Sequence, residues 1–115
     1  MRLKSKSRIL IENLEIADSL WSRCKGLLGR SSLPPGHALW IKPCNSVHTF
    51  FMKFAIDLVF LDRQMTVTKT YSRVPPGRLI GPVWRASSVI EFREGFLDES
   101  PLSMGEQLHV DSALS

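Results

Sequence analysis

The sequence predicts a β-rich α+β domain, in which one helix over about 18–28 packs on a strongly curved antiparallel or mixed sheet, or on a small barrel. Two neighbouring stretches, 47–54 and 56–62, are as densely apolar as buried strands. Residues 65–73 alternate threonines with larger side chains, which is typical of a strand. The helix is predicted by an apolar stripe at helical spacing.

The length and composition favour one domain. A chain of 115 residues with 43% apolar residues can bury a core of its own, and 23% charged residues is ordinary for a globular protein. We expect a loose basic N-terminus over residues 1–7, a single β-rich domain over 8–111 and a loose end over 112–115.

The first predicted elements are a strand region and the helix. Residues 8–17 cluster isoleucine and leucine, which favours a strand or a bent strand pair. Asp18 stands where a helix N-cap would accept the free amides of the first turn. Gly29 can adopt the left-handed conformation that ends a helix. Between them lies the apolar stripe of Leu20, Trp21, Cys24, Leu27 and Leu28.

The central stretch predicts a hairpin. After a proline-containing loop, residues 38–41 form a short strand, and 42–46 have the composition of a turn. The apolar stretches 47–54 and 56–62 are joined tightly near Lys53–Ala55, so we expect them to pair with each other.

The remaining elements follow a turn at Arg63 and Gln64. After the strand over 65–73, residues 74–86 carry three prolines and two glycines and predict a long loop. Long loops in compact domains are often functional. Three more elements complete the prediction: a strand over 87–92, at most a short helix within 95–102, and a strand over 107–110.

The net charge of +4 conceals an asymmetry. Residues 1–90 carry fourteen Lys or Arg against five Asp or Glu, whereas 91–115 carry one against six. Residues 63–90 hold five basic side chains and no acid. This arrangement could present a basic face to phosphates. Alternatively, the acidic C-terminal segment folds back over the basic surface.

The chain shows no feature of a membrane or exported protein. No apolar run approaches the ~18–20 residues of a membrane span. Glu12 and Glu15 interrupt the segment that follows the basic start, so a signal peptide is not indicated. We therefore expect a cytoplasmic protein, in which Cys24 and Cys44 are small buried hydrophobic residues. A disulfide between them stays open, although nothing in the sequence indicates one.

Three segments carry a family resemblance: GLLGRSSLP (26–34), ALWIKPCNSVHTFFMKFAIDLVFLD (38–62) and PVWRASSVIEFREG (82–95). In this order they resemble domain-of-unknown-function family 192. The resemblance implies a compact β-rich fold with a site around the central motif, and it implies no reaction. Many members look exported behind a leader, which we do not expect for this chain. Two further departures, Ala55 for a usual proline and Leu28 for a frequent methionine, look like packing variations.

Cys44, His48 and Asp57 are the candidate catalytic residues, as thiolate, base and orienting carboxylate. An extended chain separates Cys44 from His48 by roughly 13 Å, so they meet only if 44–46 is a turn. In the expected hairpin Asp57 lies beside Met52 or Lys53, away from His48. No catalytic residue is therefore assigned.

Each candidate also has a structural interpretation. Cys44 could be a buried small side chain, and His48 could bond backbone groups with both ring nitrogens. Asp57 cannot stay charged and unpaired in an apolar interior. It could pair with Lys53, pair with an arginine of the 74–86 loop such as Arg78 or Arg85, or accept backbone amides. We favour a structural carboxylate that anchors this loop. Trp40 and Trp84 either line a pocket or belong to the core.

The first functional hypothesis is a module that binds a small anionic molecule or a peptide. Its pocket would lie between the central motif and the 74–86 loop. The expected binding residues are His48, Thr49, Arg78, Trp84 and Arg85.

Two other hypotheses stay open. One is a hydrolase or thiol enzyme that uses Cys44 and His48. The other is a nucleic-acid binder, which ranks third because RNA-binding aromatic signatures are missing. No cofactor is indicated, and no metal either, because the histidines and Cys44 are spread over separate segments without a familiar spacing. The oligomeric state stays open.

Overall fold

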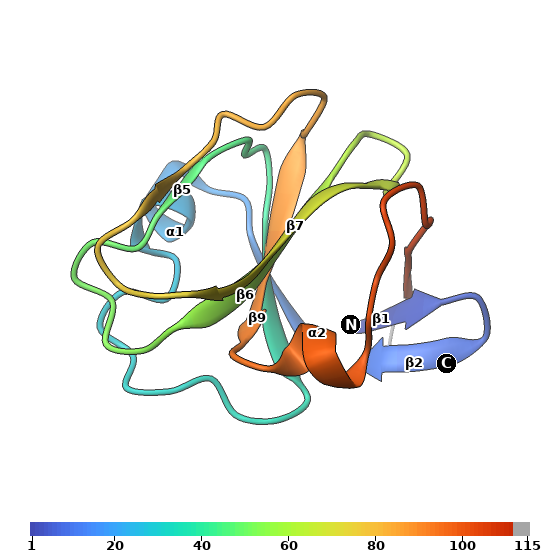
Figure 1. Cartoon of the computed structure of the whole chain (residues 1–115), viewed down its shortest axis with the longest axis horizontal. Helices are drawn as coiled ribbons and strands as arrows, with labels where there is room; N and C mark the ends of the chain where they lie inside the picture. The colour runs from blue at the N-terminus through green and yellow to red at the C-terminus, as the bar shows by residue number, and fades with distance from the viewer. Residues whose placement is uncertain (112–115) are drawn as a thin grey trace.

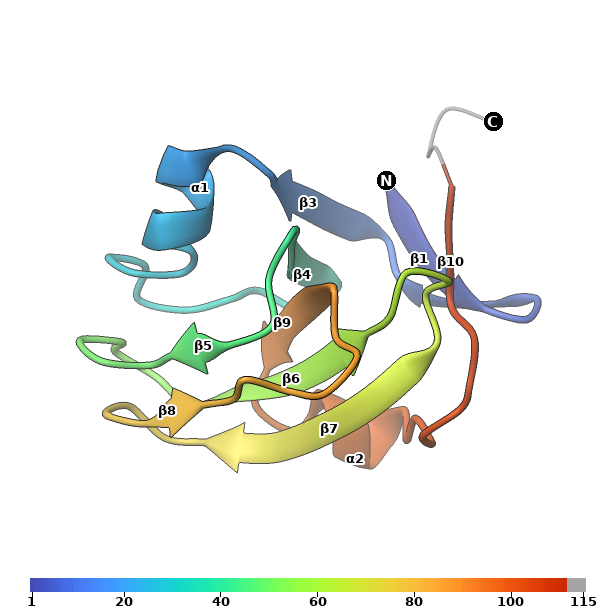
Figure 2. The same cartoon turned by 90° about the horizontal axis from the view of Figure 1, so that it is seen from above.

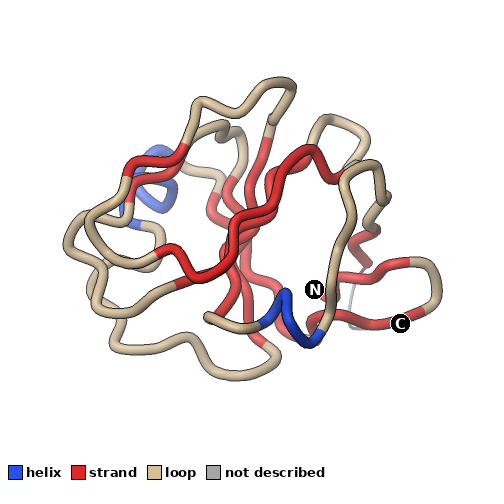
Figure 3. The backbone as a smooth tube through the Cα atoms, viewed as in Figure 1, coloured by secondary structure: helices blue, strands red, loops and turns tan. Residues whose placement is uncertain are grey.

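The computed structural model describes residues 1–111, which form ten strands and two short helices (Figures 1 and 3). The predicted loose end over 112–115 lies outside these residues, as do the side chains of Leu20 and Cys24. The strands are β1 (Arg2–Ser5), β2 (Arg8–Ile11), β3 (Asn13–Ala17), β4 (His37–Ile41), β5 (Val47–His48), β6 (Ile56–Leu61), β7 (Val67–Val74), β8 (Leu79–Ile80), β9 (Ser88–Arg93) and β10 (His109–Asp111). The helices are α1 (Leu20–Lys25) and α2 (Phe96–Glu99).

The main sheet has five strands in the order β3-β4-β9-β6-β7. The β3–β4 pair is parallel and the other pairs are antiparallel, so the sheet is mixed, as expected. A three-stranded sheet, β10-β1-β2, and a two-stranded ribbon, β5-β8, complete the described part. The main sheet has edges at β3 and β7, so the alternative of a closed barrel was wrong.

Both faces of the main sheet are buried, because its strands send alternate side chains into two separate cores. In β6, Val59 and Leu61 enter the first core, and Ile56, Leu58 and Phe60 enter the second. All six residues of β6 are buried, which explains its unbroken apolar sequence.

Different elements cover the two faces (Figure 2). The first core lies between the sheet, the β10-β1-β2 sheet and α2, and it includes Leu3, Ile11 and Phe96. The second core lies under the segment that follows α1 and under β5, and it includes Leu27, Leu33 and Val47. The second face carries the candidate site described below.

The helix α1 is shorter than predicted. Ser19, not Asp18, is the N-cap, because Ser19 and Ser22 form a reciprocal capping box. The helix ends at Gly26, whose φ of 49° lies in the left-handed region, three residues before Gly29. Trp21 is 76% exposed, so it does not belong to an inward-facing stripe.

The N-terminus is not loose, contrary to the expectation for residues 1–7. Strand β1 is the middle strand of its sheet, and Leu3 is fully buried in the first core. Arg2 and Lys4, on the other side of the strand, form ion pairs with Asp111 of β10. Pairing between opposite ends of the chain holds this segment in place.

The predicted hairpin between 47–54 and 56–62 was wrong, although β6 itself is confirmed. Only Val47–His48 is a strand, and it pairs with β8 rather than with β6. Thr49 explains the change of partner, because its backbone N–H donates to the Arg78 oxygen and its carbonyl accepts from Gly77. Phe51 then takes a φ of 65°, which turns the chain away from an extended path.

The other elements follow the predictions, with shifts of one or two residues at their ends. Strand β7 returns antiparallel to β6 after a turn that includes Arg63 and Gln64. Strands β4, β9 and β10 and the short helix α2 lie in the predicted segments. The 74–86 loop differs, because it contains β8. Within residues 1–111, no helix has the length and apolarity needed to span a membrane.

Candidate functional site

A cavity of about 260 Å³ opens beside α1, over the second face of the main sheet. We call it the Glu91 cavity. It is lined by Arg23, Lys25, Gly26, Leu27, Leu28, Ile41, Pro43, Cys44, Ser46, Val47, His48, Met52 and Glu91. These residues come from α1 and the segment after it, from the end of β4 and the turn after it, from β5 and the segment after it, and from β9. Figure 2 shows α1 and β5 on the same side of the molecule.

Glu91 is the unusual residue of the cavity. It lies in β9, a central strand of the main sheet, in register with Leu39 of β4 and Leu58 of β6. Its exposed fraction is 4%, and its Oε1 atom has no hydrogen-bond partner within residues 1–111. Burial raises the pKa of Glu91 to about 7, against a smaller opposing effect of the Arg30 charge. The carboxyl group can therefore gain or lose a proton near neutral pH.

The end of α1 lies directly over this carboxyl group. A β-carbon built on Gly26 would lie 3.7 Å from Glu91 Oε1, which is an ordinary contact distance. Gly26 is thus required by its positive φ rather than by lack of space. The chain turn that ends α1 also forms one wall of the cavity.

Basic residues stand at the α1 side of the cavity. Arg23 and Lys25 occupy the last turn of α1, where cations are favoured by the helix dipole. Arg23 Nη1 donates to the Pro43 oxygen at 3.2 Å, which ties α1 to the turn after β4. Arg23 Nε is buried and has no hydrogen-bond partner within the described residues. The guanidinium group therefore keeps a donor available.

Cys44 and His48, the two candidates from the central motif, both line this cavity. The Cys44 thiol donates to the Ser46 oxygen at 3.0 Å, and burial raises its pKa, so the neutral thiol is favoured. His48 is exposed on β5 and stacks on Phe50, with ring centroids 5.5 Å apart. The turn at 44–46 thus brings the two residues to one site, as the sequence permitted.

Asp57 lies on the opposite face of the main sheet. Its carboxylate is fully buried and accepts the backbone N–H groups of Arg73 and Leu97, each at 2.8 Å. The expectation that it accepts backbone amides is confirmed. These amides belong to β7 and α2, so the expected anchoring of the 74–86 loop was wrong. The structure does not bring Asp57 together with Cys44 and His48.

Thr49 holds the 74–86 loop instead. The side chain is buried, and its hydroxyl donates to the Pro75 oxygen at 2.7 Å and accepts the Arg78 N–H at 2.9 Å. The loop is therefore fixed along β5, beside His48, through β8.

The remaining predicted binding residues do not line the Glu91 cavity. Arg78 and Arg85 are exposed, and Trp84 is 83% exposed, so it is not a core residue. Trp40 is buried in the first core, with Lys42 Nζ 4.2 Å from its ring centroid. The two tryptophans therefore do not share one pocket wall.

Sequence reasoning missed Glu91, Arg23 and Lys25 as site residues. A signal for Glu91 was present, because it interrupts the apolar run of Val89, Ile90 and Phe92 just as Asp57 interrupts its own strand. The two basic residues gave no such signal, since charged side chains on a short helix are ordinary.

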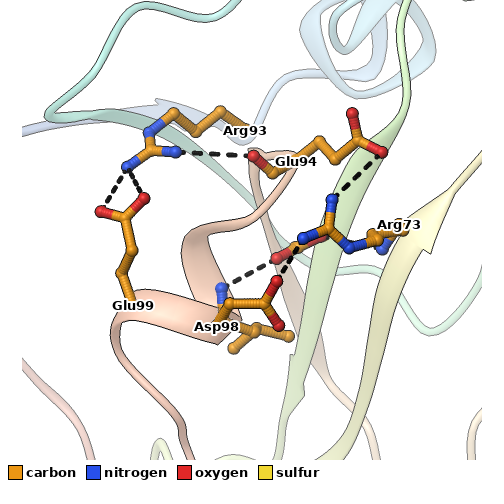
Figure 4. A network of polar contacts seen from close by, with 7 residues as sticks. Arg73, Arg93, Glu94, Asp98 and Glu99 are labelled. Carbon is orange, nitrogen blue, oxygen red and sulfur yellow. Dashed lines mark hydrogen bonds and ion pairs between the residues drawn. The ribbon is translucent and has the colours of Figure 1, made fainter.

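Acidic residues of the C-terminal segment pair with basic residues from earlier in the chain. Arg73 of β7 pairs with Glu94 and Asp98, and Asp111 pairs with the basic residues of β1 (Figure 4 shows the Arg73 network). Of the two interpretations of the charge asymmetry, these ion pairs fit the one in which the acidic C-terminal segment folds back over the basic surface. Within residues 1–111, no three His, Cys, Asp or Glu side chains gather as a metal site requires.

Comparisons with known proteins agree with the resemblance carried by the sequence. Residues 1–110 match the family DUF192, described as "Uncharacterized ACR, COG1430". A UPF0127 protein of Pyrococcus abyssi is 33% identical over 111 residues, which cover 91% of this chain and 92% of that protein. A UPF0127 protein of Thermococcus sibiricus is 30% identical over 111 residues, covering 91% of this chain and 70% of the relative.

A solved structure shares the fold. The protein of unknown function from Novosphingobium aromaticivorans superposes with a TM-score of 0.79 at 14% identity, covering 95% of this chain and 82% of that one. A likeness at this identity concerns the fold alone. The match over residues 1–110 and the archaeal relatives confirm the predicted family, and the chain belongs to DUF192, a family of uncharacterised proteins.

Proposed function

We propose that the protein is a binding module that holds a small molecule with an anionic group in the Glu91 cavity. The observation that carries this proposal is the pair of buried polar groups in one cavity, Glu91 Oε1 and Arg23 Nε, that lack partners within residues 1–111. Buried polar groups in native proteins are nearly always hydrogen-bonded. A ligand that enters the cavity would supply the missing partners.

The size and the charge of the cavity define the ligand. Its volume of about 260 Å³ lies just below the ~300–1,000 Å³ typical of small-molecule sites, so the ligand must be small. Arg23, Lys25 and His48 give it donors for an anion, and guanidinium groups suit carboxylates and phosphates. A site this small could hold only the terminal carboxylate or one side chain of a peptide.

In this proposal the 74–86 loop has a positioning role. Pairing of β5 with β8, together with the Thr49 hydrogen bonds, fixes the backbone that carries His48. Arg78, Trp84 and Arg85 would then contribute only if the ligand extends beyond the cavity. The cytoplasmic location expected from the sequence is part of the proposal, and fractionation of cells that express the tagged protein would test it.

Titration of the labelled protein with phosphate, acetate and larger phosphorylated or carboxylated metabolites would test the proposal by amide chemical shifts. We expect shifts in residues 23–28 and 44–48 and at Glu91. Arg23→Gln or Lys25→Gln should weaken binding, whereas Lys53→Gln, an exposed cation outside the lining, should not. If none of these anions shifts the cavity amides, the proposal fails.

The geometry gives less support to a thiol enzyme. The pKa of Cys44 is raised rather than lowered, and Asp57 lies across the sheet from Cys44 and His48. A nucleic-acid binder is also less favoured, because acidic residues pair with part of the basic surface. A gel-shift assay at low salt would test that alternative, since phosphate contacts weaken steeply with salt.

A further inference from the structure

We infer that the ligand of the Glu91 cavity is a small amphoteric molecule. Its amino group would bind the Glu91 carboxylate at the sheet, and its carboxylate or phosphate would bind the cationic side of the cavity. This inference rests on the proposed function and narrows its ligand class to amino acids and aminoalkyl phosphates.

The first argument is the missing partner of Glu91. The basic residue whose charge acts on the Glu91 carboxyl group is Arg30, and the guanidinium group of Arg30 is already bound to both carboxylate oxygens of Glu15, at 3.0 and 3.2 Å. A purely anionic ligand would add a like charge beside the ionised carboxylate, which is unfavourable. An ammonium group supplies the opposite charge and up to three donors.

The second argument is the arrangement of charge along the cavity. Glu91 belongs to β9, whereas Arg23 and Lys25 belong to the last turn of α1 and His48 to β5. The cavity is thus lined by groups of both signs of charge, supplied by different elements. A ligand with one charge of each sign can pair with both kinds of group, while a ligand with a single charge leaves one kind unpaired.

The third argument is the apolar lining that accompanies these groups. Its members are Leu27, Leu28, Ile41, Val47 and Met52. Aliphatic walls favour methylene groups and exclude water from the charges beside them. A short aliphatic spacer between amine and anion therefore fits the cavity better than a sugar or another polyhydroxylated body does.

The test compares matched ligands by calorimetry and amide shifts. The amphoteric probes are glycine, β-alanine, 4-aminobutyrate and phosphoethanolamine. The matched acids are acetate, propionate, butyrate and ethyl phosphate, and propylamine is the matched amine. We expect at least one amphoteric probe to bind at least about tenfold more tightly than its matched acid, as a charged hydrogen bond implies.

Variants identify the residue responsible. Glu91→Gln keeps the shape of the side chain and removes its charge, so it should abolish the preference for the amine while anions still bind. Glu12→Gln, at an exposed glutamate outside the cavity, is the matched control and should keep the preference. Folding of each variant is checked by its amide spectrum, and the ligand comparison in the unmodified protein does not depend on any variant.

The outcomes separate the two proposals. If the acids bind as tightly as their amino counterparts, or if Glu91→Gln keeps the preference, the inference fails and the proposed function stands. If propylamine, which has no anionic group, binds as tightly as the amphoteric probes, then an anionic group on the ligand is not needed. Both proposals, which require that group, would then be overturned. If no anionic or amphoteric probe shifts the cavity amides, the proposed function itself fails.

Discussion

Asp57 and Glu91 lie on neighbouring antiparallel strands, one register position apart, and face opposite sides of the main sheet. Asp57 is opposite Phe92 and Glu91 is opposite Leu58. Both carboxyl groups are buried, but their surroundings differ. Two backbone amides bind Asp57, whereas Glu91 Oε1 has no partner within residues 1–111. One sheet thus contains a fully bonded structural carboxylate and, on its other face, a buried carboxyl oxygen without a partner within residues 1–111.

The role of Asp57 follows from two irregularities in the chain. Residues Ile56 and Leu58 pair with Val74 and Tyr71, so β7 has one extra residue there, and the Arg73 N–H is directed to Asp57. At α2, the N-cap Gly95 offers no side chain, and Asp57 binds the Leu97 N–H in its place. Asp57 therefore joins β6, β7 and α2.

We predict that Asp57→Ala destabilises the protein by roughly 2–4 kcal/mol, because it leaves two amide donors unsatisfied. The midpoint of urea denaturation measures the change. Asp98→Asn is the control, since Asp98 pairs with Arg73 at the surface and such exposed pairs contribute little to stability. Equal losses for the two variants would contradict the structural role of Asp57.

Glu91 predicts a pH dependence of stability. Its pKa is about 7 in the folded protein, against 4.5 for an ordinary glutamate, so the folded state binds more protons between these values. Stability should therefore fall as the pH rises from about 4.5 to 7, by roughly 3 kcal/mol, and the contribution should be constant above this range.

Urea denaturation at pH 5 and pH 8 would measure this change in the unmodified protein and in Glu91→Gln. The difference between the two proteins isolates the contribution of Glu91 from that of every other group, because only Glu91 is changed. The unmodified protein should lose stability between pH 5 and pH 8, and Glu91→Gln should lose less stability over the same interval. If the free energy of unfolding changes with pH in the same way in both proteins, the pH dependence does not come from Glu91.

The sequence was sufficient for elements whose signal is local. Strand β6 is an unbroken apolar run, and β9 is another, apart from Glu91. The start of α1 was predicted to within two residues, but its length was not, because Gly26 stops the helix before the apolar stripe ends. Local patterns thus gave the elements but not every boundary.

Pairings between distant segments could not be predicted from local patterns. Residues 47–54 are apolar enough for a strand, yet Thr49 bonds to residues 75–78 and so removes them from a hairpin with β6. Strand β1 has the alternation of a strand, with Leu3 inward, but its partner β10 lies at the other end of the chain. The Glu91 cavity depends on such long-range pairing. Of its chemically active residues, the sequence indicated only Cys44 and His48.

The thiol of Cys44 should be unreactive. Burial raises its pKa, so less thiolate is present at neutral pH than for an exposed cysteine. We expect iodoacetamide to alkylate Cys44 more slowly than free glutathione at pH 7, with the rate rising toward alkaline pH. Mass spectrometry of the Cys44 peptide reports this site separately from Cys24, and the urea-denatured protein is the control. A rate above that of glutathione would support the thiol-enzyme hypothesis instead.

Thr49 should control the order of the 74–86 loop, since its hydroxyl is bound both to the Pro75 oxygen and to the Arg78 N–H. Thr49→Val keeps the shape of the side chain but leaves both groups without this partner, at a cost of roughly 1–3 kcal/mol. Thr49→Ser keeps the hydroxyl and should lose much less. Hydrogen exchange of the Arg78 amide should therefore accelerate in Thr49→Val and change little in Thr49→Ser.

The same pair of variants tests whether the loop positions His48. Because β8 pairs with β5 directly beside Thr49, loosening the loop should also shift the amide resonance of His48. Binding of anions in the Glu91 cavity should then weaken in Thr49→Val, although Thr49 itself does not line the cavity. If exchange at Arg78 accelerates while the resonance of His48 and anion binding stay unchanged, the loop is an independent structural feature and has no positioning role.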